Sequence, residues 1–154
     1  MKYTDEPIVT SFLPPEPPDE HAPLAMKEPL TAPQTPIIAR LRKGFPLREF
    51  ALLQKLLGIP EEELGRYLGI SGATLHRRKK AKRLETPESE RILRYARLFG
   101  QSVEVFETQD AAREWLKCPN PGTHGETPLS YADTEYGARE VENLLGRIDH
   151  GVFA

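Results

Sequence analysis

The chain has 154 residues with 21 basic and 23 acidic side chains, so its formal net charge is only −2 at pH 7. A chain of this length can bury one good core or two small ones. It contains no apolar run near the ~18 residues of a transmembrane helix and no secretory signal pattern, so we expect a cytoplasmic protein. The single cysteine, Cys118, excludes an internal disulfide and a cysteine-based zinc site.

The charge is unevenly distributed along the chain. Residues 1–39 hold 2 basic and 6 acidic side chains (net −4), residues 40–100 hold 15 and 7 (net +8), and residues 101–154 hold 4 and 10 (net −6). A basic middle part between two acidic parts indicates an anionic partner for the middle part.

Nine of the 15 prolines fall within the first 39 residues. Proline fixes φ and removes a backbone donor, so residues 1–43 are predicted to be a proline-rich segment that is extended or disordered. A spacer and a segment that becomes ordered on a partner are both compatible with this composition.

The next element is a predicted helix over residues 47–57, with Phe50, Leu53 and Leu57 on one face and Gly58 as its stop. Residues 61–80 then predict two short helices around a tight turn. Pro60 is expected at the first helical position, and Glu61 to Glu63 suit the positive end of the helix dipole.

The turn between these two helices has the residues that its geometry requires. Gly69 is expected to end the first helix in a left-handed conformation, and Ser71 is expected to be the N-cap of the second. Gly65 allows the helices to approach closely. The predicted buried contact consists of four aliphatic side chains: Leu64, Leu68, Ile70 and Leu75. This is the pattern of a helix-turn-helix, which indicates DNA as a partner.

A run of six cations without an acid follows, namely Arg77, Arg78, Lys79, Lys80, Lys82 and Arg83. At the end of a recognition helix, such a run is the electrostatic footprint of phosphate contact. The alternative is an ordinary solvated helix face. The turn that precedes the run favours DNA.

The remaining elements are also predicted to be helical. A long helix begins at Thr86-Pro87 with the apolar stripe Ile92, Ala96, Phe99, Val103 and Phe106, and Gly100 is expected to bend or break it. Thr108 is expected to cap a further helix, in which Ala111, Ala112, Trp115 and Leu116 are buried. A Pro- and Gly-rich loop covers residues 117–133. The last helix begins near Thr134 and buries Ala138, Val141, Leu145, Ile148 and Val152. The fold class is therefore all-α.

The second half of the chain resembles the toxin-binding domain of Xre/MbcA/ParS-type antitoxins. The resemblance rests on the runs 115–121, 125–129, 133–138, 141–142, 144–148 and 151–152. Residues 68–71, 74–75, 78–79 and 88–91 resemble the Xre-type helix-turn-helix half of the same proteins. The resemblance covers about residues 45–154 and implies two domains, over 44–106 and 107–154. Residues 122–125 depart from the family pattern, in which an aliphatic residue precedes the turn.

The resemblance implies the antitoxin of a type II toxin–antitoxin system. Such a protein binds and neutralises a cognate RES-domain toxin, which consumes NAD⁺, and it binds the operator of its own operon. The protein would not be an enzyme and would need no cofactor. Its partners would be the toxin, double-stranded operator DNA and a second copy of itself, with the long helix or the last helix as the dimer seam.

Candidate site residues follow from these two interfaces. Base contacts are expected among Ser71, Ala73, Thr74, His76 and Arg77, and phosphate contacts among Arg78, Lys79, Lys80, Lys82 and Arg83. A merely solvated His76 remains the alternative for that residue. Toxin contacts are expected in the loop Gly125, Glu126, Thr127, Pro128, Leu129 and at the chain end, namely Arg147, Asp149, Gly151, Val152, Phe153 and Ala154. The alternative for Val152 and Phe153 is that they close the domain's own core.

Other functions have weaker support in the sequence. The four histidines are scattered without metal-ligand spacing, and neither a phosphate-binding loop nor a nucleophile elbow is present. The main alternative is a stand-alone dimeric helix-turn-helix repressor whose C-terminal domain dimerises or binds another partner. A structural adaptor working through the proline-rich arm is the third.

Overall fold

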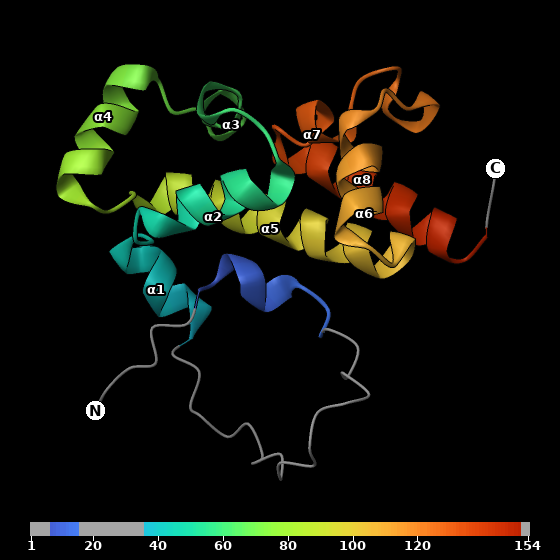
Figure 1. The fold of residues 1–154 in the computed structure, drawn as a ribbon, viewed down its shortest axis with the longest axis horizontal. Helices are drawn as coiled ribbons and strands as arrows, with labels where there is room; N and C mark the ends of the chain where they lie inside the picture. Colours follow the sequence, from blue (N-terminus) through green and yellow to red (C-terminus); the bar gives the residue numbers. More distant parts are fainter. Residues whose placement is uncertain (1–6, 16–35, 152–154) are drawn as a thin grey trace, which may run out of the picture.

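The computed structural model describes residues 7–15 and 36–151, and within these ranges all regular structure is helical. Figure 1 shows the path of the chain. The elements are η1 (Val9–Phe12), α1 (Ile37–Lys43), α2 (Arg48–Leu57), α3 (Glu61–Leu68), α4 (Gly72–Ala81), α5 (Thr86–Phe106), α6 (Gln109–Lys117), η2 (Pro121–Thr123), α7 (Pro128–Tyr131) and α8 (Glu135–Asp149). The all-α prediction is confirmed.

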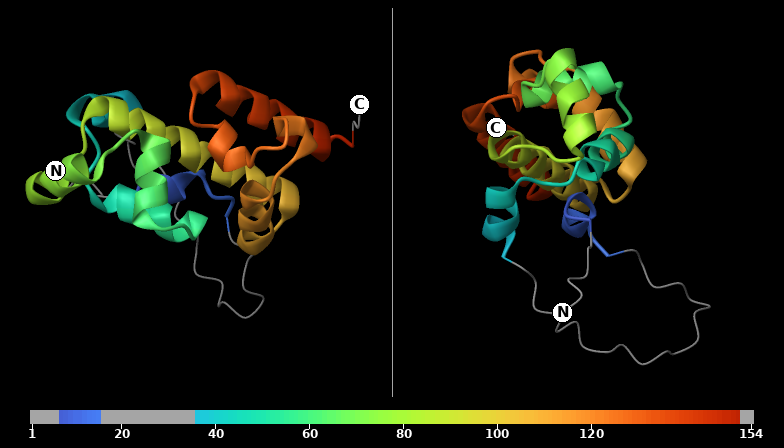
Figure 2. Two further views of the ribbon diagram at one scale, coloured as in Figure 1. Left: turned by 90° about the horizontal axis from the view of Figure 1, so that it is seen from above. Right: turned by 90° about the vertical axis from the view of Figure 1, so that its left-hand side faces the viewer.

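Helix α5 is the central element of the molecule. It contacts η1, α1, α2, α3, α6 and α8 (Figures 1 and 2). Its stripe includes Ile92, Ala96 and Phe99, each exposed by 1% or less. The two halves of the chain therefore share one helix and a continuous core.

Gly100 does not break this helix, because α5 continues to Phe106. A Cβ added at Gly100 would lie 2.1 Å from the carbonyl oxygen of Phe12. Glycine is therefore required here so that the backbone of the N-terminal segment can lie directly on α5.

The N-terminal segment is more ordered than its composition predicts. Val9–Phe12 is a short 3-10 helix, and Ile37–Lys43 is an α-helix, so the prediction of an extended or disordered 1–43 is wrong for these two stretches. Ile8 and Val9 are only 2% and 1% exposed. The proline content gave no indication of this, because two buried side chains and a tertiary contact stabilise the turn.

The remaining predicted helices are found, with shifted ends. Leu47 and Pro60 are N-cap residues, so α2 and α3 each begin one residue after the expected start, whereas α5 begins at Thr86 as predicted. The predicted loop over 117–133 also contains η2 and α7. Both of these short turns begin at a proline after a capping side chain, which is a helix start that a Pro-rich composition conceals.

Candidate functional site

The junction between α3 and α4 has the geometry of a helix-turn-helix. Gly69 ends α3 with φ at 67°, in the left-handed region that glycine adopts without strain. Ser71 caps α4, its hydroxyl accepting a hydrogen bond from the Thr74 N–H at 3.2 Å. The four predicted aliphatic contacts are buried, with exposures between 0% and 6%. A Cβ at Gly65 would lie 2.9 Å from the Ile70 carbonyl oxygen, so this glycine permits the close approach of the turn.

One face of α4 is free of packing. At about 100° per residue, Ala73, His76, Arg77 and Lys80 lie opposite the buried Leu75, and all four are exposed. The hydroxyl of Thr74 accepts a hydrogen bond from Arg77 at 3.2 Å. The predicted base-contacting residues therefore lie together at the start and on the outer face of α4.

Arg78 is committed to contacts within the protein. Its guanidinium donates three hydrogen bonds of 2.9 to 3.1 Å to the Glu88 carboxylate and also pairs with Glu85 at 3.1 Å. Burial would raise the pKa of Glu88, but the hydrogen bonds from Arg78 and the Glu85 N–H outweigh it and lower the pKa. The Glu88 hydrogen bond correspondingly raises the pKa of Arg78. This pair joins α4 to α5 and orients the helix-turn-helix on the core.

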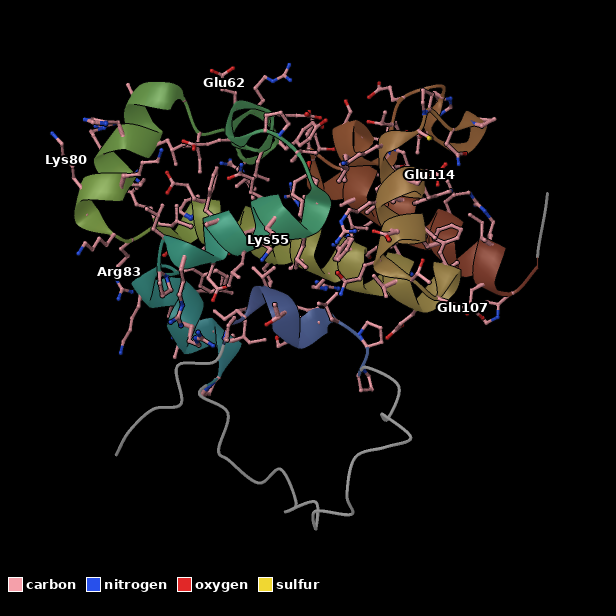
Figure 3. All side chains as sticks on the ribbon, viewed as in Figure 1. Lys55, Glu62, Lys80, Arg83, Glu107 and Glu114 are labelled. Atoms are coloured by element: carbon pink, nitrogen blue, oxygen red, sulfur yellow. The ribbon has the colours of Figure 1, made fainter. Side chains whose placement is uncertain are left out.

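Two further cations of the run are also engaged in contacts. Lys79 pairs with Glu61 at 2.6 Å, across a groove between α3 and α4 that Glu62 and Arg66 also line. Arg83 donates to the carbonyl oxygens of Lys43 and Gly44 at 3.3 and 2.7 Å. Figure 3 shows Lys80 and Arg83 at the outer edge of this half of the molecule.

On the other half, the predicted toxin-facing loop divides into a buried and an exposed part. Pro128 and Leu129 are buried, and the Leu129 carbonyl accepts a hydrogen bond from Tyr95 at 3.0 Å. Thr127 is the N-cap of α7. Gly125 (φ +85°) and Glu126 are exposed. The side chains of Pro128 and Leu129 thus hold the loop in place rather than face outward.

The loop packs against the outer part of α8. A Cβ at Gly122 would lie 2.7 Å from a methyl carbon of Leu144, which places η2 directly on this helix. Arg147 lies one turn beyond Leu144 and is exposed, as is Asp149. The structure thus places η2, which directly precedes the loop, against α8 one turn before Arg147. The predictions for Val152, Phe153 and Ala154 lie outside the described residues.

Helix α6 joins the two halves of the protein. Arg113 and Lys117 donate to the carbonyl oxygens of Leu56 and Gly58, where the dipole of α2 is negative. Trp115 is half-buried against Phe106, with ring centroids 5.3 Å apart. Next to this junction, burial and a hydrogen bond to Glu63 raise the pKa of Tyr67 to about 12. Two of the four cations of residues 101–154 therefore face the first half, and the outer surface of the second half is acidic.

Sequence reasoning missed two groups of residues that the fold makes prominent. One is Arg42 and Lys43 at the end of α1, whose position was hidden because residues 36–43 were assigned to the proline-rich segment. The other is Glu49, fully buried in α2, whose carboxylate accepts hydrogen bonds from the Ile8 and Val9 N–H groups at 2.9 and 3.0 Å. Its partner lies 40 residues away, so no local pattern could reveal it.

Other kinds of site find no support within residues 7–15 and 36–151. No group of three or more His, Cys, Asp or Glu side chains in these ranges is arranged to hold a metal ion. None of the helices described there is both long and apolar enough to cross a membrane.

Comparisons with known proteins agree with this division of the molecule. Residues 36–97 match the model of the antitoxin Xre-like helix-turn-helix domain. Residues 101–151 match the model of the antitoxin Xre/MbcA/ParS C-terminal toxin-binding domain. The fold and its two surfaces thus define a helix-turn-helix protein with a toxin-binding domain.

Similar proteins narrow this class further. An antitoxin Xre of Yersinia enterocolitica is 34% identical over 122 residues, covering 78% of this chain and 82% of that protein. One of Photorhabdus laumondii is 35% identical over 116 residues, covering 74% and 78%. A protein of Sphingobium named Prs ADP-ribosylating antitoxin is 26% identical over 142 residues, covering 86% and 89%. The chain belongs to the Xre antitoxin family and is the antitoxin of a toxin–antitoxin system.

Proposed function

We propose that this antitoxin neutralises a RES-domain toxin that consumes NAD⁺ and that it represses its own operon by binding operator DNA as a homodimer in the cytoplasm. The main support is the separation of its surfaces, with an exposed basic face on α4 and an acidic outer surface on the C-terminal domain. The Sphingobium relative is named an ADP-ribosylating antitoxin. ADP-ribosylation uses NAD⁺, which fits a toxin of this chemistry.

The DNA interface would use the two groups of α4 residues in different ways. Ser71, Ala73, Thr74, His76 and Arg77 would face base edges, because they lie at the start and on the free face of α4. Lys80 and Lys82 would contact phosphates directly. Arg78, Lys79 and Arg83 would contribute mainly by positioning, since each already has a partner within the protein.

The toxin interface would be centred on Gly125, Glu126, Arg147, Asp149 and the chain end. Pro128 and Leu129 would support this surface from the core. For the dimer seam, α8 is a better candidate than α5, because α5 is enclosed and exposes only Pro87, Glu90, Arg97 and Glu104. Tyr136 on α8 is 74% exposed, the most exposed large hydrophobic residue in the described ranges.

Co-expression with the product of the neighbouring reading frame tests the toxin half of this proposal. We expect a stable complex that copurifies through a tag on the antitoxin and restores growth and cellular NAD⁺. A chain with Glu126→Lys, which changes one exposed side chain of the loop and leaves Gly125 in place, should weaken the complex. Failure of any partner to copurify would support the stand-alone repressor instead.

A further inference from the structure

The end of α1 is joined directly to the turn between α4 and α5. Residues 46 and 83 form an antiparallel bridge, flanked by backbone hydrogen bonds from Leu47 to Lys82 and from Leu84 to Phe45. The Thr86 hydroxyl donates to the Leu41 carbonyl at 2.8 Å. Together with the Arg83 contacts described above, these bonds make α1 and the turn one continuous surface, visible at one end of the molecule in Figure 1.

This surface carries cations that the fold does not use. Arg42, Lys43, Lys80 and Lys82 are all exposed, and none has an ion-pair partner among the residues that the structure describes. By contrast, Arg78 and Lys79 of the same run are paired with carboxylates. Free positive charge therefore extends from the end of α4 onto α1, and Arg77 on the outer face of α4 also has no carboxylate partner in the described ranges.

The opposite side of the helix-turn-helix is unsuited to a phosphate. A helix N-terminus normally attracts anions, because its free N–H groups and dipole are positive. In α3 the first turn instead consists of Glu61, Glu62 and Glu63. Lys79 of α4 reaches this turn, but Glu61 already neutralises it at 2.6 Å, and Arg66 is the other cation that lines the same groove. Figure 3 shows Glu62 directed outward at this position.

We propose that the phosphate-binding surface of this protein runs from α4 across Lys82 onto Arg42 and Lys43 of α1, and that the start of α3 stays off the DNA backbone. The inference rests on the proposed DNA binding and adds which backbone contacts accompany base readout. It assigns a binding role to α1, which neither the helix-turn-helix pattern nor the cationic run 77–83 includes.

The test measures DNA affinity of the full chain against salt concentration, with the upstream operon region and an unrelated duplex as probes. Counted for each bound protomer, every lost phosphate contact lowers the slope of log K against log salt by about 0.9. We expect Arg42→Ala/Lys43→Ala to reduce this slope by about 2 and the affinity at 0.1 M salt by about tenfold or more on both duplexes. The matched control, Lys55→Ala/Arg139→Ala, removes the same charge from exposed positions elsewhere and should leave the slope unchanged.

Two single substitutions make the test independent of folding and of net charge. Lys82 has φ at 55°, so Lys82→Gly removes a cation while relieving backbone strain, and it should lower the slope by about 1 without loss of stability. Glu62→Lys should leave the slope nearly unchanged if the start of α3 is off the DNA. A slope that steepens by about 1 would place α3 on the backbone.

The outcomes separate the two proposals. If the wild-type chain binds neither duplex at 50 mM salt, the proposed operator binding fails and this inference falls with it. If the wild type binds but Arg42→Ala/Lys43→Ala matches the control, the α1 surface alone is overturned.

Discussion

The role of Arg78 in the structure differs from the phosphate contact that the cationic run predicts for it. In sequence it is one of six neighbouring cations, yet its guanidinium is 16% exposed and binds a carboxylate that is 9% exposed. The pair connects α4 to the central helix α5. A partly buried charge pair of this kind is sensitive to the loss of either partner, because the remaining charge keeps its desolvation cost.

The lowered pKa of Glu88 has a direct consequence for stability. A carboxyl whose pKa is lower in the folded state stabilises the protein above its unfolded pKa, and this contribution disappears as pH falls through the folded pKa. We therefore expect Glu88→Gln to reduce the free energy of unfolding by about 2 kcal/mol at pH 7. Glutamine can still accept the Glu85 N–H, so the capping interaction is kept.

Urea unfolding of both proteins from pH 7 to pH 3 measures this effect. The difference in free energy of unfolding between wild type and Glu88→Gln should shrink as the pH falls below 4.5, the ordinary pKa of glutamate. Glu90→Gln, at an exposed position in the same helical turn, is the control and should change stability by less than about 0.5 kcal/mol. A difference that stays constant with pH would show that the Glu88 charge does not stabilise the fold.

At the scale of elements, the docking of η1 on α2 and α5 is the least expected feature. The Glu49 carboxylate accepts hydrogen bonds from the Ile8 and Val9 N–H groups at the start of the 3-10 turn. An acidic side chain stabilises a helix N-terminus in the same way. The Phe12 carbonyl lies against Gly100. The segment thus contacts α2 in the first half of the protein and the C-terminal third of the shared helix α5.

Two glycine substitutions isolate this contact. Gly100→Ala places a Cβ 2.1 Å from the Phe12 oxygen, so we expect the segment to be displaced and stability to fall by about 1–3 kcal/mol. Gly146 lies within α8 with nothing within 4 Å of its Cβ position, so Gly146→Ala should stabilise by about 0.5–1 kcal/mol. Hydrogen exchange at the Ile8 and Val9 amides should accelerate only in Gly100→Ala. Equal stabilisation by both substitutions would contradict the docked segment.

At the scale of the whole molecule, α5 and the α6 contacts place the two functional surfaces on one framework. Helix α5 contributes to both family regions, 36–97 and 101–151, and α6 binds the end of α2 through Arg113 and Lys117. The division of the chain at residues 44 and 107 stays a prediction. What the structure adds is that the buried hydrophobic residues of both halves form one continuous core in the described part of the chain.

The end of the chain provides a prediction at this scale. The buried hydrophobic core of the described part reaches Leu145, so a chain that ends at His150 should keep its fold. We expect this truncation to abolish toxin neutralisation in a growth assay while the melting temperature stays within about 2 °C of wild type, as for a surface change. Phe153→Ala is the matched single substitution. A truncated chain that unfolds would show that the end closes the antitoxin's own core.

Local patterns in the sequence determined the helix-turn-helix. Gly69, Ser71 and the aliphatic residues around them act over one or two helical turns, so their spacing alone specifies the turn and the buried contact. The same holds for the caps Thr108 and Thr134, which begin α6 and α8 as predicted. Family resemblance supplied the toxin-binding half.

Only the tertiary structure decided which partner each side chain within these patterns contacts. Arg78, Lys79 and Lys80 are consecutive cations to which the sequence pattern gives the same role. In the structure, Arg78 pairs with Glu88 of α5 and Lys79 with Glu61 of α3. Glu49 and Gly100 acquire their roles from a segment that lies 40 or more residues away in the chain. Such contacts depend on which surfaces the fold brings together, and no local propensity carries that information.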